Sequence, residues 1–563
     1  MHGCGAGSHT NVSKALHLAR LKQQAFDLAS GASWPRLDQF SCVVLLAGPH
    51  HQFSGQQQQC LSDYVAAGGG LVIILTAWSG SLASLVGAKE SSEPSIDGTR
   101  QPMDMCFSAE LLPGLEGITI TEEMSVSELE LLPGSEAVVQ SFVGLPIAWR
   151  HRIGRGRVLV WNSDFIERKI AQGLIVASVM NVQPVTIRPI VNAGIVQIDD
   201  FPCAAAPMKF PPVAEEYGLT LLEFYDRVWL PDMLELAERH GIPYTFLTVF
   251  NYNALVEPPF DFDEWTTTHE GARSGAEPFA VFAAHLVREQ HELGLHGYNH
   301  ISLYLDIWGN KINMVLAMQA AKERWQQDGL GPLPRTYAPP NNDYDAAGLE
   351  AVTKAFPSVQ AVCGYLEGDF EKGRERDIGP EPWNPDLLCI PRVTSGYILT
   401  PRAKFRMIAQ LGLLGAWTHF LHPDDIIDIP ERRPTAQRLR NFDNSPWRGD
   451  GSSRQRGLYY QFADWLDEVG RNYPWLRYTR TEDAGAILRS HLANSVGVYF
   501  VSDEVTIDTQ TMTFFQVCIN GDRKIDPKTL SGAAVIDERQ LAGQTLYTIE
   551  GQQKQIRFGL LPK

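Results

Sequence analysis

Apolar runs and helical patterns divide the chain into three parts. In the first part, residues 40–47 form an apolar run of strand length, residues 56–67 have the apolar spacing of a helix, and residues 71–75 form a second apolar run. Three glycines at 68–70 separate this helix from the following strand, and glycine supplies the positive φ at which many helices end. The pattern predicts an α/β domain over residues 1–185.

The middle part, residues 190–480, alternates strands with helices and predicts a second α/β domain. Its candidate strands are residues 194–198, 244–249, 292–295, 335–338, 361–365, 387–391 and 415–421. The helical segments between them are residues 231–240, 279–290, 312–327, 346–356 and 403–411. Residues 251–278 are too long for an ordinary strand-to-helix connection and predict a functional or lid-like insertion.

The last part, residues 484–563, contains only short strand patterns. Apolar runs at 497–501, 512–519, 544–549 and 554–558 predict strands, and Asn520-Gly521 is a hairpin signal. We expect a small β-sandwich, with a carbohydrate-binding or a packing role.

Composition excludes several classes of protein. The 563 residues carry a formal net charge of −17, whereas nucleic-acid binding needs a basic surface. The 8 cysteines include no Cys-x-x-Cys pair, so neither a zinc ribbon nor a disulfide framework is expected. No apolar run reaches the roughly 18 residues of a membrane span, and the first residues do not form a signal peptide. Either the protein is cytoplasmic or the numbered chain lacks its export segment.

Two short segments carry the candidate chemistry. His296 and His300 follow the strand at 292–295, and Asp199-Asp200 ends the strand at 194–198. If these strands belong to an α/β barrel, both segments lie at the carboxyl face where such folds build active sites. Two imidazoles and a carboxylate form a three-ligand site that suits zinc and leaves one position open. A pair of histidines alone can arise by chance or as a surface pair, but the aspartate pair makes the combination more specific.

These segments resemble the motifs of the polysaccharide deacetylases, carbohydrate esterase family 4. Ile198-Asp199-Asp200-Phe201-Pro202 and His296-Gly-Tyr-Asn-His300 are similar to the first two motifs. Tyr337-Ala338-Pro339-Pro340-Asn341 resembles the third, and His419-Phe-Leu-His422-Pro-Asp-Asp425 the last. The four occur in the family's order over roughly residues 190–480, and the resemblance implies an irregular (β/α)7 barrel.

The resemblance also implies a role for each matching residue. Asp200, His296 and His300 correspond to the metal ligands, with zinc as the expected metal, and Asp199 corresponds to the general base. His422 is the candidate general acid. His419 competes with it for this role. Strand positions three apart face opposite sides of the sheet, so only one of the two can face the site, and we expect His419 to be a packed or supporting histidine.

The third motif departs from the family. Ala338 stands where the family has an arginine that hydrogen-bonds the catalytic carboxylate, so Arg335 or Arg392 would have to supply that charge. If neither does, activity would be weak or absent. Asn341 stands where the family has tyrosine, but its backbone N–H can still serve as an oxyanion donor.

Two further groups of residues are candidates near this site. Trp383, in a loop between two prolines, is the best of several aromatic candidates for a sugar platform. Asp424 and Asp425 either orient His422 or cap the next helix, and we favour capping.

The first domain resembles the glutamine-amidotransferase-like, flavodoxin-like domains that accompany carbohydrate enzymes, with residues 154–162 similar to their closing hairpin. Residues 76–78, at the turn where a catalytic version needs a cysteine, contain none, so we interpret the domain as a non-catalytic scaffold or sugar-binding module.

The series of three domains is similar to that of enzymes that modify bacterial exopolysaccharides such as Pel. This resemblance implies a metal-dependent deacetylase of an acetylated amino-sugar polysaccharide, an extracytoplasmic location, and exopolysaccharide assembly proteins as candidate partners. Two alternatives remain open. One is a metal-binding barrel without catalysis that serves carbohydrate binding or assembly, and the other is a hydrolase of an O-acetyl ester or a glycosidic bond.

Overall fold

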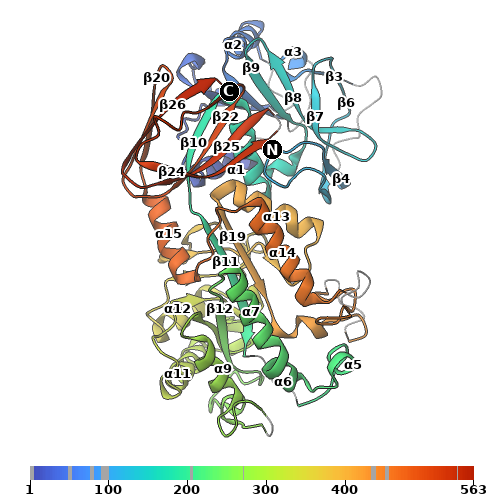
Figure 1. The fold of residues 1–563 in the computed structure, drawn as a ribbon, viewed down its shortest axis with the longest axis vertical. Helices are drawn as coiled ribbons and strands as arrows, with labels where there is room; N and C mark the ends of the chain where they lie inside the picture. The colour runs from blue at the N-terminus through green and yellow to red at the C-terminus, as the bar shows by residue number, and fades with distance from the viewer. Residues whose placement is uncertain are drawn as a thin grey trace.

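The computed structural model describes residues 6–47, 53–75, 82–90, 100–202, 207–269, 272–432, 439–450, 456–541 and 543–562. Its class is mixed α/β, as the sequence predicts. Figure 1 shows the N-terminal sheet and the C-terminal strands together in the upper half, above a lower half made of alternating strands and helices. None of the described helices has the length and apolar character needed to cross a membrane.

The N-terminal sheet has a parallel centre and an antiparallel extension. Strands β1 (Cys42–Ala47), β2 (Gly70–Leu75) and β9 (Gly156–Trp161) are parallel. Antiparallel strands continue the sheet: β8 (Pro146–Ile153), β7 (Glu136–Gln140), β4 (Gln101–Phe107) and β5 (Thr119–Met124). The predicted helix is α2 (Gly55–Ala66), which begins with a capping box between Ser54 and Gln57. The turn at residues 76–78 lies outside the described residues.

Smaller elements complete this part of the chain. They are α1 (Ala6–Leu18), α3 (Ala83–Val86), α4 (Gln172–Val182) and the strand pair β3 (Ala88–Glu90) and β6 (Leu129–Leu131).

The central sheet contains every strand that the apolar runs of the middle part predict. Its parallel members are β11 (Ala193–Phe201), β12 (Thr245–Asn251), β13 (Glu292–Asn299), β14 (Thr336–Tyr337), β15 (Ala361–Val362), β17 (Asn384–Cys389), β18 (Thr394–Ser395) and β19 (Ala416–Leu421), with β16 (Gly379–Glu381) antiparallel to β17. β17 pairs with β15, and a few residues later β18 pairs with β19. Residues 384–395 therefore link the two ends of the strand order, and the sheet curls back on itself.

Helices lie between these strands and after them. The longer ones are α7 (Leu230–His240), α9 (Phe279–Val287), α11 (Lys311–Gln327), α12 (Ala346–Ala355), α13 (Pro401–Leu414), α14 (Leu458–Asn472) and α15 (Thr481–Ala493). The short ones are α5 (Val213–Tyr217), α6 (Leu221–Phe224), α8 (Asp263–Thr266) and α10 (Leu305–Trp308).

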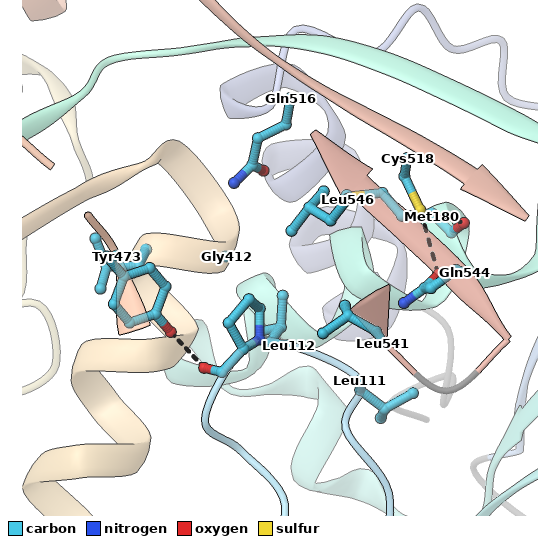
Figure 2. Close-up of a pocket in the computed structure, with 12 residues that line it drawn as sticks. Leu111, Leu112, Met180, Gly412, Tyr473, Gln516, Cys518, Leu541, Gln544 and Leu546 are labelled. Carbon is cyan, nitrogen blue, oxygen red and sulfur yellow. Dashed lines mark hydrogen bonds between the residues drawn. The ribbon is translucent and has the colours of Figure 1, made fainter. Parts of the chain in front are cut away.

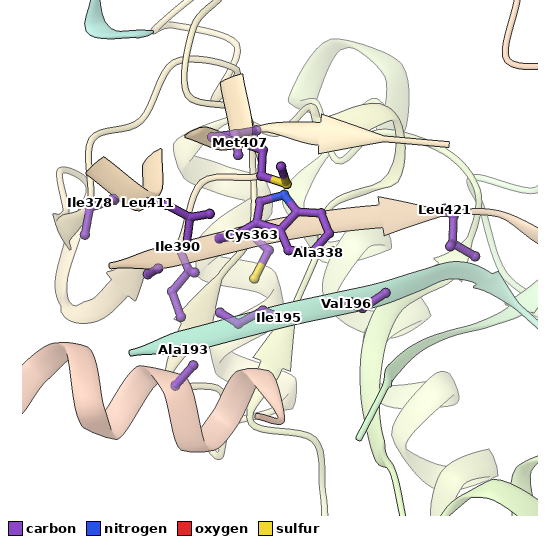
Figure 3. Packing of buried hydrophobic residues seen from close by; sticks show 14 of the residues in the cluster. Ala193, Ile195, Val196, Ala338, Cys363, Ile378, Ile390, Met407, Leu411 and Leu421 are labelled. Carbon is purple, nitrogen blue, oxygen red and sulfur yellow. The ribbon is translucent and has the colours of Figure 1, made fainter. Parts of the chain in front are cut away.

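The central strands of this sheet are buried on both faces, which explains their continuous apolar runs. Every residue of β11 is buried. Figure 3 shows Ile195 and Val196 of this strand among side chains from distant segments, including Met407 of α13 and Ile390. This packing fixes the carboxyl end of β11, where Asp199 and Asp200 lie.

Two four-stranded sheets form a C-terminal β-sandwich. They have the orders β10-β22-β25-β24 and β20-β21-β26-β23. The strands are β10 (Val185–Ile190), β20 (Val496–Val501), β21 (Glu504–Thr509), β22 (Phe514–Asn520), β23 (Arg523–Ile525), β24 (Ala533–Leu541), β25 (Gln544–Gly551) and β26 (Gln555–Pro562). Helix α15 extends across the expected boundary at residue 484, and β10 comes from before the central sheet. The sandwich is therefore not confined to residues 484–563.

The three parts meet in one packed junction. Helix α4 lies against α13, and a side chain at Gly173 would collide with the Ala409 carbonyl oxygen, so glycine permits this close approach. In Figure 2, Tyr473 donates a hydrogen bond to the Pro113 carbonyl oxygen, 2.6 Å away. The cavity here has a volume of about 10 Å³, enough for about one water molecule.

Candidate metal centre

Asp200, His296 and His300 come together at the carboxyl ends of β11 and β13. His296 Nε2 lies 3.3 Å from Asp200 Oδ1, and His300 Nε2 lies 3.2 Å from the same oxygen. The three side-chain donor atoms all lie within 4.8 Å of one another. The sequence predicted this set, and its geometry fits one divalent metal ion.

The triad also contains buried polar atoms without a hydrogen-bond partner, which fits a metal site. Among the described residues, Asp200 Oδ1 and His296 Nε2 are buried without a hydrogen-bond partner, which is costly unless something else satisfies them. His296 Nδ1 lies 2.8 Å from the Ala338 carbonyl oxygen. Since a carbonyl only accepts, Nδ1 carries a hydrogen, and Nε2 is the ring nitrogen directed toward Asp200.

The backbone at the triad adopts uncommon conformations. Asp200 has φ 56°, in the left-handed region that non-glycine residues rarely adopt. Gly297, directly after His296, has φ 117°, where a side chain would be strained. Such conformations persist only where the surrounding structure holds them, and they concentrate at functional sites.

The electrostatics of the triad favour a cation. Burial alone would raise the pKa of Asp200, but the neighbouring histidines outweigh it and hold this pKa far below its usual value. Burial and the charge of Asp200 raise the pKa of the nearby Asp424 to about 6. Burial lowers the pKa of His300, which favours the neutral form in which an imidazole binds a metal ion.

Asp199 is paired with a buried arginine. One Arg392 nitrogen, Nη1, donates to both Asp199 oxygens, at 2.7 and 2.6 Å, and Nη2 donates to Asn342. The guanidinium lies 3.9 Å from the centre of the Phe420 ring. Burial opposes ionisation, yet Arg392 and two nearby histidines hold the pKa of Asp199 below its usual value.

Of the two arginines considered for this role, only Arg392 reaches Asp199. Arg335 precedes β14, at the opposite end of the strand from the triad. Its side chain is 57% exposed and lies 3.8 Å from Glu482. Of the two alternatives, Arg335 is therefore wrong, and Arg392 supplies the charge beside Asp199 that Ala338 lacks.

His422 lies between two carboxylates. Its Nε2 is 3.7 Å from Asp199 Oδ2, and its Nδ1 is 3.2 Å from Asp425 Oδ1. Asp425 Oδ2 accepts the His422 backbone N–H at 3.1 Å, so Asp425 both caps this turn and faces the imidazole. Burial lowers the pKa of His422, but Asp425 and Asp199 outweigh burial and raise it. Arg440 donates to Asp425 Oδ1 at 2.9 Å.

His419 faces the opposite side of β19. Its ring stacks on Phe462 and meets the edge of Trp465 in α14, and Nδ1 lies 3.0 Å from Thr394 Oγ1. Burial lowers its pKa to about 3. His419 is thus a packed histidine, as expected.

The other predicted residues have different surroundings. Asn341 is exposed, with φ 57°, and its side-chain amide donates to Ser302 Oγ at 3.1 Å. Trp383 is half-buried in the hairpin between β16 and β17, with the Arg376 guanidinium 4.2 Å from its ring centre and Tyr344 at its edge. One face of Trp383 is therefore covered by Arg376.

Sequence reasoning missed Asn342, Arg440 and Tyr252. Asn342 accepts from Arg392, Arg440 holds Asp425, and Tyr252 lies against His300. The spacing of His422 and Asp425, three residues apart across a helix start, was the one local signal for this half of the site.

Fold and site together define an α/β protein with a candidate metal triad at the carboxyl edge of a curled, mainly parallel sheet. A family model matches residues 6–543, so the chain belongs to the family described as "Uncharacterised protein conserved in bacteria (DUF2194)". No curated protein matches the chain in sequence.

Solved structures give only partial, distant similarity. A β-galactosidase from Rahnella sp. R3 is 16% identical over 32% of this chain and 29% of its own chain, with a TM-score of 0.24. A glutamine amidotransferase from Thermotoga maritima is 13% identical over 29% of this chain and 72% of its own, with a TM-score of 0.22. The match thus spans less than a third of the galactosidase chain.

Substituting Arg392 by methionine is expected to destabilise the protein by about 3 kcal/mol at neutral pH, because it leaves the Asp199 charge buried and unpaired. Asp199 has a lowered pKa, so its pairing stabilises the fold above the unfolded-state pKa and this stability is lost as the pH falls through the folded-state pKa. The deficit of the variant should therefore shrink toward acid pH.

Urea unfolding of wild type and variant, from pH 7 down to below the usual aspartate pKa of about 4, measures this deficit. Arg335→Met is the matched control and should change stability little, since its side chain is exposed. An Arg392→Met variant as stable as Arg335→Met at pH 7 would contradict the expectation.

Proposed function

We propose that this protein is a metal-dependent deacetylase that removes N-acetyl groups from an amino-sugar polysaccharide. The observation that carries the proposal is the position of Asp199 and His422 beside the candidate triad of Asp200, His296 and His300. Amide hydrolysis needs an activated water molecule and a proton for the leaving amine, and the site offers a group for each. When bound, a divalent ion supplies Lewis-acid chemistry by acidifying water and polarising a carbonyl oxygen.

Asp199 takes the role of general base. Arg392 keeps its carboxylate ionised at neutral pH and fixes both oxygens, so the side chain is held in one orientation before substrate binds. Asp200, the adjacent residue, is turned toward the histidines instead. The two adjacent carboxylates therefore have different roles, Asp200 as a metal ligand and Asp199 as the proton acceptor.

His422 takes the role of general acid. With Nδ1 facing Asp425, its Nε2 is the atom that can deliver a proton to the leaving nitrogen. The raised pKa of His422 keeps it protonated over more of the neutral range. The Asn341 backbone N–H remains the candidate oxyanion donor.

Two observations bear on the alternatives. Arg392 pairs with Asp199, which removes the main reason to expect an impaired base from Ala338. Both oxygens of Asp425 are already engaged by His422 and Arg440, which disfavours it as one of the two free carboxylates of a glycosidase. An O-acetyl esterase would use the same catalytic groups, so only the substrate distinguishes it from an N-deacetylase.

The remaining parts of the proposal rest on the family resemblance. We infer that the curled sheet is the irregular (β/α)7 barrel of the deacetylases and that the metal is zinc. We further infer that the protein binds its substrate outside the cytoplasm and that exopolysaccharide assembly proteins are its partners. The N-terminal domain and the sandwich would then serve as scaffold or sugar-binding modules.

Acetate release tests the proposal directly. The zinc-loaded full chain is incubated with N-acetylated glucosamine and galactosamine oligomers, and with O-acetylated sugars of matched length. Acetate from the N-acetylated oligomers, lost on chelation, supports the proposal. Zinc binding without acetate favours the non-catalytic alternative, and acetate from the O-acetylated sugars alone favours an esterase.

An Asp425→Asn substitution is expected to move the alkaline limb of kcat/KM to lower pH. Burial opposes protonation of His422 and Asp425 counteracts it, so removal of this charge lowers the pKa of His422. The general acid would then lose its proton at a lower pH. Asp443→Asn, at an exposed position, serves as the control. An unchanged alkaline limb would exclude His422 as the group that sets it.

A further inference from the structure

Tyr252 contacts two members of the triad at once, although no motif includes it. Its ring stacks on His300, with centroids 6.1 Å apart and planes 21° apart. Its hydroxyl donates to the backbone carbonyl oxygen of Asp200 at 3.2 Å. One side chain therefore bridges the ligand from β11 and the ligand that follows β13.

The two ligands that Tyr252 contacts are those that most need support. His300 lies just past the end of β13 and is 28% exposed, whereas His296 is 1% exposed and held by the Ala338 carbonyl. Asp200 has the strained φ of 56°, and a hydrogen bond to its carbonyl oxygen fixes the orientation of that peptide.

Tyr252 is itself held in place by the start of the 251–278 insertion. Asn251 Oδ1 accepts the backbone N–H groups of Tyr252 at 2.8 Å and Asn253 at 2.9 Å. The side chain of Asn251 also donates to the Asp261 carbonyl oxygen, at 3.1 Å.

Hydrogen bonds hold the first part of the insertion against the end of β13. Tyr298 donates to the Asp261 carbonyl oxygen at 2.9 Å, and Asn299 donates to the carbonyl oxygens of Asn253 and Leu255 at 3.1 and 2.8 Å. The strand that leads into His300 thus also fixes the loop that carries Tyr252.

We infer that Tyr252 is a positioning residue of the metal site, which sets the orientation of the His300 imidazole and of the Asp200 peptide. The inference rests on the proposed metal site. Groups behind metal ligands typically alter affinity by about 10- to 100-fold when removed, because they fix the ligand before the ion arrives. Residues 251–253, at the start of the insertion, thereby support the site.

Metal titration of the full chain tests this inference without any activity assay. Zn²⁺ affinity is measured by calorimetry, and Co²⁺ supplies a visible absorption spectrum that reports ligand geometry. Tyr252→Leu removes the stacked ring and the hydroxyl, whereas Tyr252→Phe removes the hydroxyl alone. Tyr473→Phe, which loses a tyrosine hydrogen bond to a backbone carbonyl at the distant junction, is the matched control.

We expect Tyr252→Leu to raise the Kd for Zn²⁺ about 10-fold or more and to change the Co²⁺ spectrum. Tyr252→Phe should raise the Kd about 3- to 5-fold, as expected for one lost hydrogen bond, with the spectrum retained. Tyr473→Phe should bind as wild type does. Thermal unfolding of the metal-free proteins separates ligand positioning from general destabilisation.

Wild-type affinity and spectrum in Tyr252→Leu would overturn the inference and leave the metal site intact. If Tyr252→Leu does not fold, Tyr252→Phe decides, and wild-type affinity in that variant overturns the inference. A wild-type chain that binds neither ion overturns both the metal site and the inference.

Discussion

Replacement of His296 and His300 together by alanine is expected to abolish metal binding. The double variant retains Asp200 as the sole member of the triad, and one carboxylate does not hold a borderline metal ion against water. The Kd for Zn²⁺ should rise by at least about three orders of magnitude, equivalent to about 4 kcal/mol. Calorimetric titration and metal analysis after dialysis measure the loss.

Single substitutions of the triad should each remove tight binding too. Asp200→Ala takes away the oxygen that both imidazoles approach, at 3.3 and 3.2 Å. His285→Ala is a suitable control, because His285 is a partly exposed histidine whose Nε2 lies 2.8 Å from the Asp328 carbonyl oxygen. Tight binding by the double histidine variant would refute the assigned ligand set.

The apolar runs predicted the strands because burial on both faces leaves a continuous hydrophobic signal. That signal failed at β10, where Arg188 and Pro189 interrupt the run. Arg188 is nevertheless buried, and it donates to the carbonyl oxygens of Gly412 and Leu413 and to Gln516. These partners are more than 200 residues away, so the sequence around β10 gives no sign of them.

The triad could be predicted because its ligands occur in short motifs after strands. The support of Asp199 could not, because Arg392 is 193 positions away and only the curled sheet brings the two together. Arg335 is nearer to Ala338 in sequence, but it stands at the amino end of its strand and faces away from the site. Position along a strand, not distance in sequence, decides which arginine can act.

Ala338 shows a second limit of motif comparison. The side chain lacks the expected guanidinium, but the backbone carbonyl of the same residue accepts from His296 Nδ1 at 2.8 Å. A backbone interaction leaves no requirement on residue type. The third motif thus retains one contact to the site while the arginine function is supplied from Arg392.

Asp199→Asn is expected to retain the metal and lose turnover. Asparagine has nearly the same shape but cannot accept a proton, so kcat should fall by about 10²- to 10⁴-fold, the usual contribution of a general base. Zn²⁺ affinity should stay near the wild-type value, since Asp199 is directed toward Arg392 and His422 and not into the triad.

The same variant also leaves Arg392 without its charged partner, so its effect on catalysis must be separated from its effect on stability. Its unfolding in urea is therefore measured beside that of Arg392→Met. Asp199→Asn leaves the positive charge of Arg392 unpaired, whereas Arg392→Met leaves the negative charge of Asp199 unpaired. A folded Asp199→Asn protein that binds zinc without turnover identifies Asp199 as the base. Loss of zinc in this variant would instead make Asp199 a ligand, and turnover near the wild-type rate would assign the base to another group.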